Sequence, residues 1–272
     1  MIIIGEKLNG SIPSMAKAIA EKNEARIKSL ARSQAAAGAD YLDVCASVQV
    51  DTEVETLKWL LDLVQGACDV PICLDSPSAE TLVAALPYVN KPGVVNSVSG
   101  EGNKIDLIFP AIADSQWGCV ALLCDDRGIP STVERRMEVF EAIMKRAEEF
   151  KIAPSRLYID PLVVTLSTND AAFTTFAECT RQIKKLYPDI HITSGLSNIS
   201  FGLPVRKLIN MAFMILSIEA GMDSAIVDPT NRDMLGVIYA AEALLENDEF
   251  CLEYIGKYKA GLIGPPLAER TK

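Results

Sequence analysis

The sequence predicts an α/β fold, specifically a single-domain (β/α)₈ barrel of the TIM-barrel type. Short apolar runs, often β-branched, alternate eight times with longer amphipathic runs. Continuous apolar runs are typical of parallel strands that are covered on both faces. One barrel needs about 250 residues, and the chain has 272. No Pro-, Gly- or Ser-rich linker interrupts it, so we expect residues 1–272 to form one domain.

Each expected strand is followed by an expected helix. The strands cover 2–4, 41–45, 72–75, 93–96, 120–124, 157–160, 190–194 and 225–228. The helices cover 15–37, 51–65, 79–88, 104–115, 133–150, 171–186, 205–220 and 233–245. An open, doubly wound sheet is the alternative, but it usually has fewer units and often a Gly-rich phosphate loop. No G-x-G-x-x-G follows a strand and no Walker-type loop occurs, which favours the closed barrel.

Two helix starts carry a capping-box pattern, in which a Ser or Thr and a Glu three residues later satisfy backbone N–H groups reciprocally. Thr52 and Glu55 have this spacing at the start of the helix expected at 51–65. Ser131 and Glu134 have it before the helix expected at 133–150. We therefore expect Thr52 and Ser131 to cap these two helices.

The charge and hydropathy of the chain exclude two classes of function. Nucleic-acid binding needs a basic stripe or patch, whereas the net charge is −10 and no basic stripe is visible. An acidic surface instead keeps a cytosolic protein soluble. The longest apolar stretch, 208–218, contains Asn210. It falls well short of about 18 uninterrupted apolar residues, so we expect no membrane span.

The cysteines and the first residues indicate a cytoplasmic protein. Seven cysteines occur, an odd number, and no two have C-x-x-C spacing. Buried, reduced thiols explain them better than a disulfide framework or a structural zinc site. The opening residues 1–7 form too short an apolar run, and one too soon charged, for a signal peptide. We therefore expect a cytoplasmic location.

Polar side chains gather at the expected carboxyl ends of the strands, where the active site of an α/β barrel lies. From the first strand to the eighth they are Glu6, Asn9, Asp43, Asp75, Asn96, Asp160, Ser197, Asn198 and Asp228. An Asp or Asn at a strand end often caps the next helix. We expect a cap or a turn for Asp228, which precedes Pro229, and Asp75 could also be a cap. The set as a whole still predicts carboxylates and amides that converge on one mouth.

The usual catalytic groups are scarce at this mouth. His191, the only histidine, lies near the start of the seventh strand and so at the opposite end of the barrel. We expect neither a His-based metal site nor a Ser-His-Asp triad. Lys7 could form a Schiff base in an aldolase, although an exposed or salt-bridged lysine is the simpler interpretation. The loop after the seventh strand has no Lys or Arg before Arg206, which argues against a phosphorylated sugar. Carboxylates and amides suit a flat, neutral heterocycle rich in hydrogen-bond donors.

Five motifs, in order along almost the whole chain, resemble the pterin-binding methyltransferases. They are IGEKLNG at 4–10, LDS at 74–76, VNSVSGE at 95–101, YIDPL at 158–162 and GLSNISFG at 195–202. This family includes the methyltetrahydrofolate:corrinoid/iron–sulfur protein methyltransferase and the folate domain of cobalamin-dependent methionine synthase. Dihydropteroate synthase shares the pterin pocket, but its basic phosphate-binding signature is not found here.

The resemblance implies a role for each matching residue. Asp75, Asn96 and Asp160 match the family's pterin-gripping residues, Asn198 matches the asparagine that reaches the pterin N5, Gly195 and Ser197 match the loop along the pterin, and Glu6 matches a carboxylate near the same site. Two places depart from the pattern. Cys45 stands where relatives often have an asparagine, and the segment 163–170 matches poorly, so the contacts of both with substrate stay open.

The activity that the resemblance implies is methyl transfer between N5 of tetrahydrofolate and the cobalt of a corrinoid (cobalamin). A hydrogen bond between Asn198 and N5 that strengthens as N5 takes up a proton would stabilise the transition state more than the ground state, and the side-chain amide can offer either its oxygen or its nitrogen. Folate is then the substrate, and a separate corrinoid protein carries the cobalt. We expect no metal bound by this chain itself. The resemblance also implies a homodimer, the commonest oligomer.

Three alternatives stay open. The chain could be a dihydropteroate synthase-like barrel, a Schiff-base aldolase that uses Lys7, or a non-catalytic subunit that binds pterin without turnover. The sequence leaves undecided the direction of methyl transfer, the corrinoid partner and the pathway.

Overall fold

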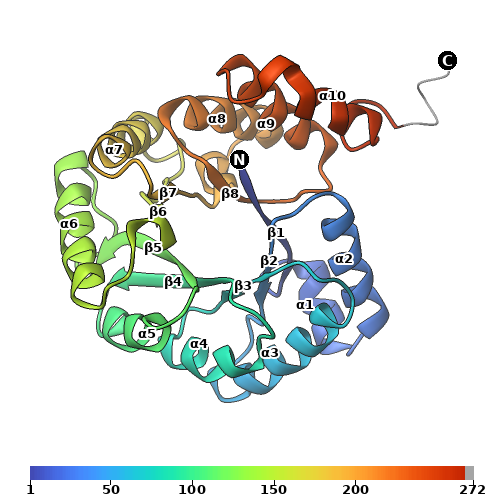
Figure 1. Cartoon of the computed structure of the whole chain (residues 1–272), viewed down its shortest axis with the longest axis vertical. Coiled ribbons are helices and arrows are strands. Elements are labelled where there is room, and N and C mark those ends of the chain that lie inside the picture. The colour runs from blue at the N-terminus through green and yellow to red at the C-terminus, as the bar shows by residue number, and fades with distance from the viewer. Residues whose placement is uncertain (267–272) are drawn as a thin grey trace.

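Eight parallel strands close around a common axis in the computed structural model, which describes residues 1–266 (Figure 1). They are β1 (Ile2–Asn9), β2 (Tyr41–Cys45), β3 (Ile72–Asp75), β4 (Val94–Gly100), β5 (Gly118–Asp125), β6 (Leu157–Asp160), β7 (His191–Ile192) and β8 (Ser224–Val227). Neighbours follow chain order from β1 to β7, and β8 pairs with the free edge of β1. The predicted barrel is confirmed for the described residues. The expected domain, 1–272, extends six residues beyond them.

Closure of the ring between β7 and β8 depends on a few backbone hydrogen bonds. β7 has only two residues, whereas the sequence predicted a strand over 190–194. The N–H of Asp223 donates to the carbonyl of Ile192 at 3.3 Å, and the N–H of Ile226 donates to that of Ser194 at 3.2 Å. Gly195 forms one more bridge to Ile226. The chain after β7 therefore closes the barrel and then turns into a loop at its mouth.

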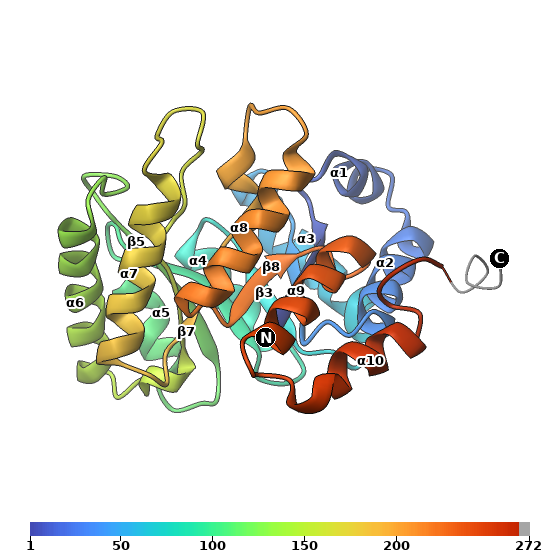
Figure 2. The same ribbon diagram turned by 90° about the horizontal axis from the view of Figure 1, so that it is seen from above.

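Helices surround the barrel, with at least one after each strand (Figure 2). The α-helices are α1 (Pro13–Ala20), α2 (Glu24–Ala36), α3 (Val50–Gln65), α4 (Ala79–Ala85), α5 (Lys104–Ile112), α6 (Val133–Glu149), α7 (Ala172–Leu186), α8 (Arg206–Ala220), α9 (Arg232–Leu244) and α10 (Leu252–Lys259). Short 3₁₀ helices are η1 (Leu86–Tyr88), η2 (Pro154–Arg156), η3 (Leu196–Ser200) and η4 (Glu249–Cys251). In Figure 2 the loops before α7 and α8 rise above the carboxyl ends of the strands, while the N-terminus and α10 lie toward the other end.

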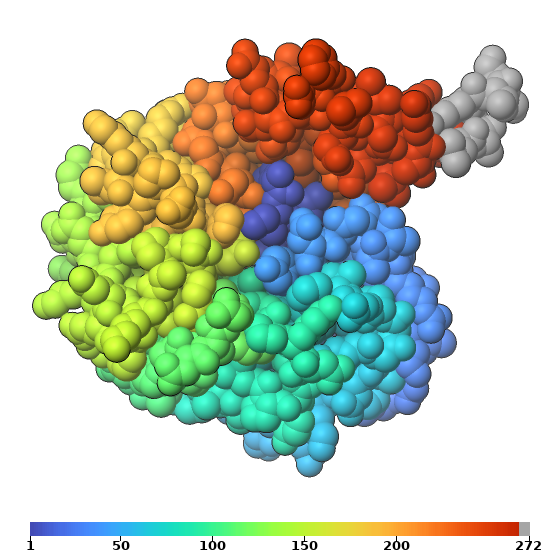
Figure 3. Space-filling view, viewed as in Figure 1, coloured from blue at the N-terminus to red at the C-terminus, as the bar shows by residue number. Residues whose placement is uncertain are grey.

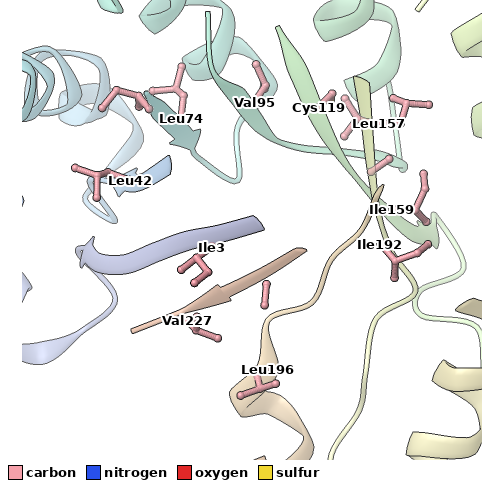
Figure 4. Close-up of a cluster of buried hydrophobic side chains, with 14 of the residues drawn as sticks. Ile3, Leu42, Leu74, Val95, Cys119, Leu157, Ile159, Ile192, Leu196 and Val227 are labelled. Atoms are coloured by element: carbon pink, nitrogen blue, oxygen red, sulfur yellow. The ribbon is translucent and has the colours of Figure 1, made fainter. Parts of the chain in front are cut away.

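Alternation along the strands divides the buried side chains into two layers, because successive strand residues point to opposite faces. The outer layer packs between sheet and helices and includes Ile3, Leu42, Leu74, Val95 and Ile159 (Figure 4). The inner layer lies inside the barrel and is formed by Ile4, Cys73, Val94, Val120 and Tyr158. Figure 3 shows the end of the barrel where the strands begin, with the N-terminus at its centre. The barrel is thus a packed core, and its other end is left for the site.

The prediction of one continuous helix over 15–37 is wrong, because two helices, α1 and α2, occupy this segment. Lys22 between them has a left-handed backbone conformation, with φ at 51°. The Asn23 side chain accepts a hydrogen bond from the N–H of Arg26 at 3.1 Å and so caps α2. A side chain that satisfies a free backbone donor lets a new helix begin inside an amphipathic run.

Both predicted caps are displaced along the chain, and one helix was missed. α3 begins at Val50, so Thr52 lies inside it and its hydroxyl donates to the carbonyl of Gln49 at 3.1 Å. At α6 the cap is Thr132, which accepts from the N–H of Arg135 at 3.3 Å, in place of Ser131. The short helix α10, far along the chain, was not predicted.

The cysteines agree with the expected reduced state. All seven are free, and five of them are buried, whereas Cys68 is half-buried and Cys251 is exposed. Among residues 1–266, no helix is both long and apolar enough to span a membrane.

Candidate active site

A layer of polar side chains lies above the inner apolar layer, at the carboxyl ends of the strands. Asp43, Asp75, Asn96 and Asp160 each come two residues after a member of the inner apolar cluster, namely Tyr41, Cys73, Val94 and Tyr158. Because side chains repeat with a period of two, the polar groups point to the same interior. Asp75 and Asn96 are direct partners across β3 and β4. The parity of these four positions agrees with carboxylates and amides that converge on one mouth.

Asn9 joins the carboxylates of two neighbouring strands. Its Nδ2 donates to Oδ2 of Asp43 and to Oδ2 of Asp75, each at 2.9 Å. Its Oδ1 accepts from both the N–H and the hydroxyl of Ser11. The backbone beside it is tight, since a Cβ on Gly10 would lie 2.1 Å from the carbonyl oxygen of Ala46. Only glycine fits there, which gives the IGEKLNG motif a structural reason.

A β-bulge in β1 sets the positions of Glu6 and Lys7. The pairing of β1 with β2 shifts register between Gly5 and Leu8, and the N–H of Lys7 donates to the side chain of Gln34 at 2.9 Å. The strand therefore continues through the bulge to Asn9, beyond the predicted 2–4. Bulges commonly redirect side chains beside active sites.

Lys7, the lysine that an aldolase would need, lies in this bulge and forms an ion pair. Lys7 Nζ lies 2.9 Å from Oδ2 of Asp228, in the salt bridge that was the simpler expectation. Asp228 Oδ1 accepts from the N–H of Thr230 at 2.9 Å, so the predicted turn at Asp228 is confirmed. The pKa of Glu6 is raised, chiefly because the carboxyl is buried. The charge of Lys7 opposes this shift, and the charge of Asp228 adds to it.

Burial raises the pKa values of the neighbouring Asp43 and Asp75 carboxyls. Desolvation raises the pKa of Asp43 well above its ordinary value, and the neighbouring Asp75 raises it further. Desolvation also raises the pKa of Asp75, to about 6, against the hydrogen bonds from Cys45 and Asn9 that lower it. A charge is costly to bury, and two adjacent carboxylates do not ionise together. Burial therefore favours the protonated form at both positions, with the direction strongest at the fully buried Asp43, and Asp75 is the member of the pair that lies opposite Asn96 at the mouth.

Asp160 is a third buried carboxylate, carried by β6. Its Oδ1 accepts from the N–H of Leu162 at 2.8 Å, in a turn where Leu162 has a positive φ of 63°. Burial raises its pKa to about 6, while backbone N–H groups of Leu162 and Gly195 and the charge of Arg136 lower it. The helix cap considered for Asp75 is not formed, because Ser78 caps the helix that follows, α4.

The loop after β7 carries Gly195, Ser197 and Asn198 along the rim. Asn198 lies in η3, where its N–H donates to the carbonyl of Gly195 at 3.3 Å. Its side chain is exposed, as is that of Ser197, in contrast to the buried carboxylates below. A Cβ on Gly195 would lie 3.5 Å from Asn198 Nδ2, in ordinary contact. The structure therefore leaves the Asn198 amide accessible at the mouth.

The sequence reasoning located Asn9 and Asp43 at strand ends but assigned neither to the site. The Asn9 bridge could have been suspected only from the adjacency of β1, β2 and β3. His191 lies at the start of β7, away from the mouth as predicted, stacked on Tyr158 at 4.7 Å between ring centres. Among residues 1–266, no three His, Cys, Asp or Glu side chains are grouped as a metal site would need.

Comparison with known proteins places this chain beside a family of pterin-binding enzymes. Residues 6–228 match the family described as "Pterin binding enzyme". The chain is 53% identical over 271 residues to the methylcorrinoid:tetrahydrofolate methyltransferase of Eubacterium limosum, across 99% of this chain and 100% of that protein. It is 30% identical over 252 residues to the methionine synthase of Mycobacterium tuberculosis, across 85% of this chain but only 21% of that protein.

A solved structure shows the same fold at low sequence similarity. Yersinia pestis DHPS with a pterine–sulfa conjugate superposes with a TM-score of 0.61 at 13% identity, over 90% of this chain and 93% of that chain.

Proposed function

Because this chain belongs to the family of pterin-binding enzymes, as its motifs predicted, we propose that it is a methyltransferase that acts on tetrahydrofolate and a corrinoid. One observation carries the proposal beyond the family. The acceptors of Asp75, Asn96 and Asp160 face the interior of one mouth, and Asn198 stands exposed on its rim. A pterin presents an amino group and ring N–H groups on one edge, and carboxylate and amide oxygens can accept from them.

Each of the seven predicted site residues has its own proposed role toward the pterin. Asp75, Asn96 and Asp160 grip the donor edge of the pterin, and Gly195 and Ser197 line the ring. Glu6 adds a carboxylate beside the same mouth. Asn198 acts at N5. Asn9, which holds Asp75 in place through its 2.9 Å hydrogen bond, is a positioning residue.

The direction of transfer is proposed from the full-length relative, which is named as a methylcorrinoid:tetrahydrofolate methyltransferase. The nitrogen lone pair of N5 attacks the methyl carbon, the carbon–cobalt bond breaks with its electron pair left on cobalt, and N5 then releases its proton. The Asn198 amide oxygen accepts a hydrogen bond from N5–H. That bond strengthens as N5 becomes positive, so it stabilises the transition state selectively. Holding N5 in line with the methyl group lowers the barrier further.

We propose that the corrinoid is carried by a separate protein, and that the chain forms a homodimer. Exposed apolar side chains occur on the outer helices α8, α9 and α10 and on η4 between the last two, and they are Ile215, Leu216, Leu244, Phe250, Leu252 and Ile255. An apolar patch of this kind marks an interface, and a second copy of the chain is the proposed occupant.

The location and the extent of the enzyme are also proposals. Seven free thiols favour a reducing, cytoplasmic compartment. We take residues 1–272 as one methyltransferase unit.

The decisive experiment mixes the protein with tetrahydrofolate and methylcobalamin without oxygen and follows the cobalt spectrum. Conversion of the methylated to the cob(I) form, dependent on both protein and folate, is the expected result. Binding of tetrahydrofolate with no spectral change, also with a corrinoid protein present, would indicate a non-catalytic subunit. Trapping of a carbonyl substrate by borohydride would indicate the aldolase, and formation of dihydropteroate would indicate the synthase.

A further inference from the structure

A cavity beside the candidate active site is not used by the pterin-gripping residues. Its volume is about 330 Å³, and it is lined by Ser197 of η3, Arg206, Lys207 and Met211 of α8, and Asn231 and Met234 at the start of α9. This is within the range of small-molecule sites, roughly 300–1,000 Å³. The loop that leads into α8 rises at the mouth of the barrel in Figure 2. Ser197 lines this cavity and directly precedes Asn198, the residue proposed to act at N5.

The cavity carries an uncompensated positive charge. The Arg206 guanidinium donates to the carbonyl of Ser197 at 2.7 Å and to the hydroxyl of Ser200 at 3.0 Å. Neither partner is charged, the other neighbour of this guanidinium is the ring of Phe201 at 5.7 Å, and the ion pairs found within residues 1–266 do not include Arg206. Lys207 differs, because its Nζ is paired with Asp233. A single net cation at the mouth of a chain with a charge of −10 would favour an anionic ligand there.

The helix that carries Arg206 adds to this attraction. α8 has 15 residues and begins after Val205, which offers no side-chain cap, and its first turn contains no acidic residue. The first N–H groups of a helix lack partners inside it. They and the helix dipole attract anions.

Two methionines in the lining of the cavity suit an aromatic ring. Met211 and Met234 bring two thioethers, which are adaptable and contact aromatic edges favourably. A ligand that fits this lining has an aromatic ring followed by carboxylates.

We propose that this cavity, the tail site, binds the p-aminobenzoyl-glutamate part of the folate. The inference rests on the proposed function, since it requires a pterin with N5 at Asn198. The tail leaves the pterin from the carbon next to N5, so it starts beside Ser197. The ring then packs on the methionines, and the glutamate carboxylates face Arg206 and the start of α8. The enzyme should therefore select folates over pterins that lack this tail.

Calorimetry with two ligands tests the tail site. Tetrahydrofolate and 6-methyltetrahydropterin, which has no tail, are titrated into the wild-type protein and into Arg206→Ala, Arg206→Lys and Arg181→Ala. Arg181 is the matched control, because it removes the same charge from an outer ion pair with Glu219. Melting curves accompany each variant.

The ratio of the two dissociation constants is the readout. We expect the wild type and Arg181→Ala to prefer tetrahydrofolate by about tenfold to a hundredfold, as one charge-assisted contact provides. Arg206→Ala should lose most of this preference, because its affinity for tetrahydrofolate falls far more than its affinity for 6-methyltetrahydropterin, and Arg206→Lys should retain part. An unchanged ratio in Arg206→Ala overturns the tail site. So does an equal loss for both ligands, which would mean that Arg206 acts only by supporting η3. Failure of every protein to bind either ligand would count against the proposed function instead.

Discussion

The guanidinium of Arg206 donates from Nη2 to the backbone carbonyl of Ser197, the residue immediately before Asn198, at 2.7 Å. From the other side, the N–H of Leu166 donates to the carbonyl of Ile199 at 3.0 Å. A 3₁₀ turn of five residues has strained hydrogen bonds and little stability of its own. The turn that presents Asn198 is therefore held between α8 and the loop after β6. A fixed donor or acceptor is what transition-state stabilisation requires.

The first prediction concerns folate binding. Asp75→Ala and Asp160→Ala should each weaken tetrahydrofolate affinity by roughly 2–5 kcal/mol, because pterin donors are left unpaired in a buried site. Asp69→Ala is a control, since Asp69 is a fully exposed surface partner of Lys91. Isothermal calorimetry checks all three, and unchanged affinity in both site variants would remove the pterin pocket from this interpretation.

The second prediction is a pH dependence of binding. Burial raises the pKa values of Asp75 and Asp160 to about 6. Above this pH both carboxylates are mainly charged and act only as hydrogen-bond acceptors. The affinity for tetrahydrofolate should therefore be highest above about pH 6 and should fall as the pH drops below it. Each required carboxylate lowers affinity about tenfold per pH unit below its pKa. Dissociation constants measured across this range should show the decline, and Asp160→Asn should flatten part of it. A flat profile in the wild type would contradict the assignment of both carboxylates as acceptors.

The raised pKa values of Asp75 and Asp160 also affect the stability of the fold, and this effect has the opposite dependence on pH from that of folate binding. Because the folded-state pKa values exceed the unfolded ones, folding takes up protons, and this contribution to stability decreases as the pH rises from about 4 through about 6. Affinity and stability should therefore respond in opposite directions, which separates a binding effect from partial unfolding.

How far the sequence can predict this site depends on the range of the interactions. Asp75, Asn96 and Asp160 follow from strand parity, because each lies two residues after an apolar side chain of the inner layer. That information is local, and the family motifs agree with it. Their roles toward the pterin, like those of Gly195, Ser197, Asn198 and Glu6, stay predictions.

Interactions between distant segments could not be predicted in the same way. The bulge at Lys7 depends on Gln34, a buried residue of α2. The segment 163–170, which matched the family poorly, is tied to the Asn198 loop through the Thr165 hydroxyl, which donates to the carbonyl of Phe201 at 2.7 Å. The sequence pattern of the contacting segments does not predict such hydrogen bonds, because they form only when the folded barrel brings these segments together.

The third prediction concerns metal. Chelator treatment followed by gel filtration should leave methyl transfer unchanged when the methylated corrinoid is supplied. The described residues offer no grouped His, Cys, Asp and Glu ligands, and a protein-bound zinc ion usually needs three or four such ligands. Activity that disappears on chelation and returns with zinc or magnesium would refute this.

The fourth prediction concerns assembly. Analytical ultracentrifugation at micromolar concentration should show a homodimer. A double substitution, Ile215→Glu with Leu216→Glu, should shift it toward monomer, because it places charges on an exposed apolar part of α8. Lys145→Glu, on α6, serves as the control. A wild-type monomer would rule out the proposed dimer, and a dimer insensitive to the double substitution would place its interface elsewhere.

The last prediction is that Asn198→Ala depresses methyl transfer far more than folate binding. Asp75, Asn96 and Asp160 hold the far edge of the ring, whereas Asn198 acts on N5, where charge develops. Loss of one preorganised hydrogen bond of this kind costs about 10²–10³ in rate. If Asn198 only shaped the loop, the variant would lose stability and binding together. Single-turnover rates with saturating folate, beside a melting curve, distinguish the two. Asn198→Asp, which keeps an acceptor oxygen, should recover part of the rate. If folate bound to Asn198→Ala still reacts at the wild-type rate, the residue has no catalytic role and the proposed mechanism is wrong, because nothing else exposed on η3 carries an amide.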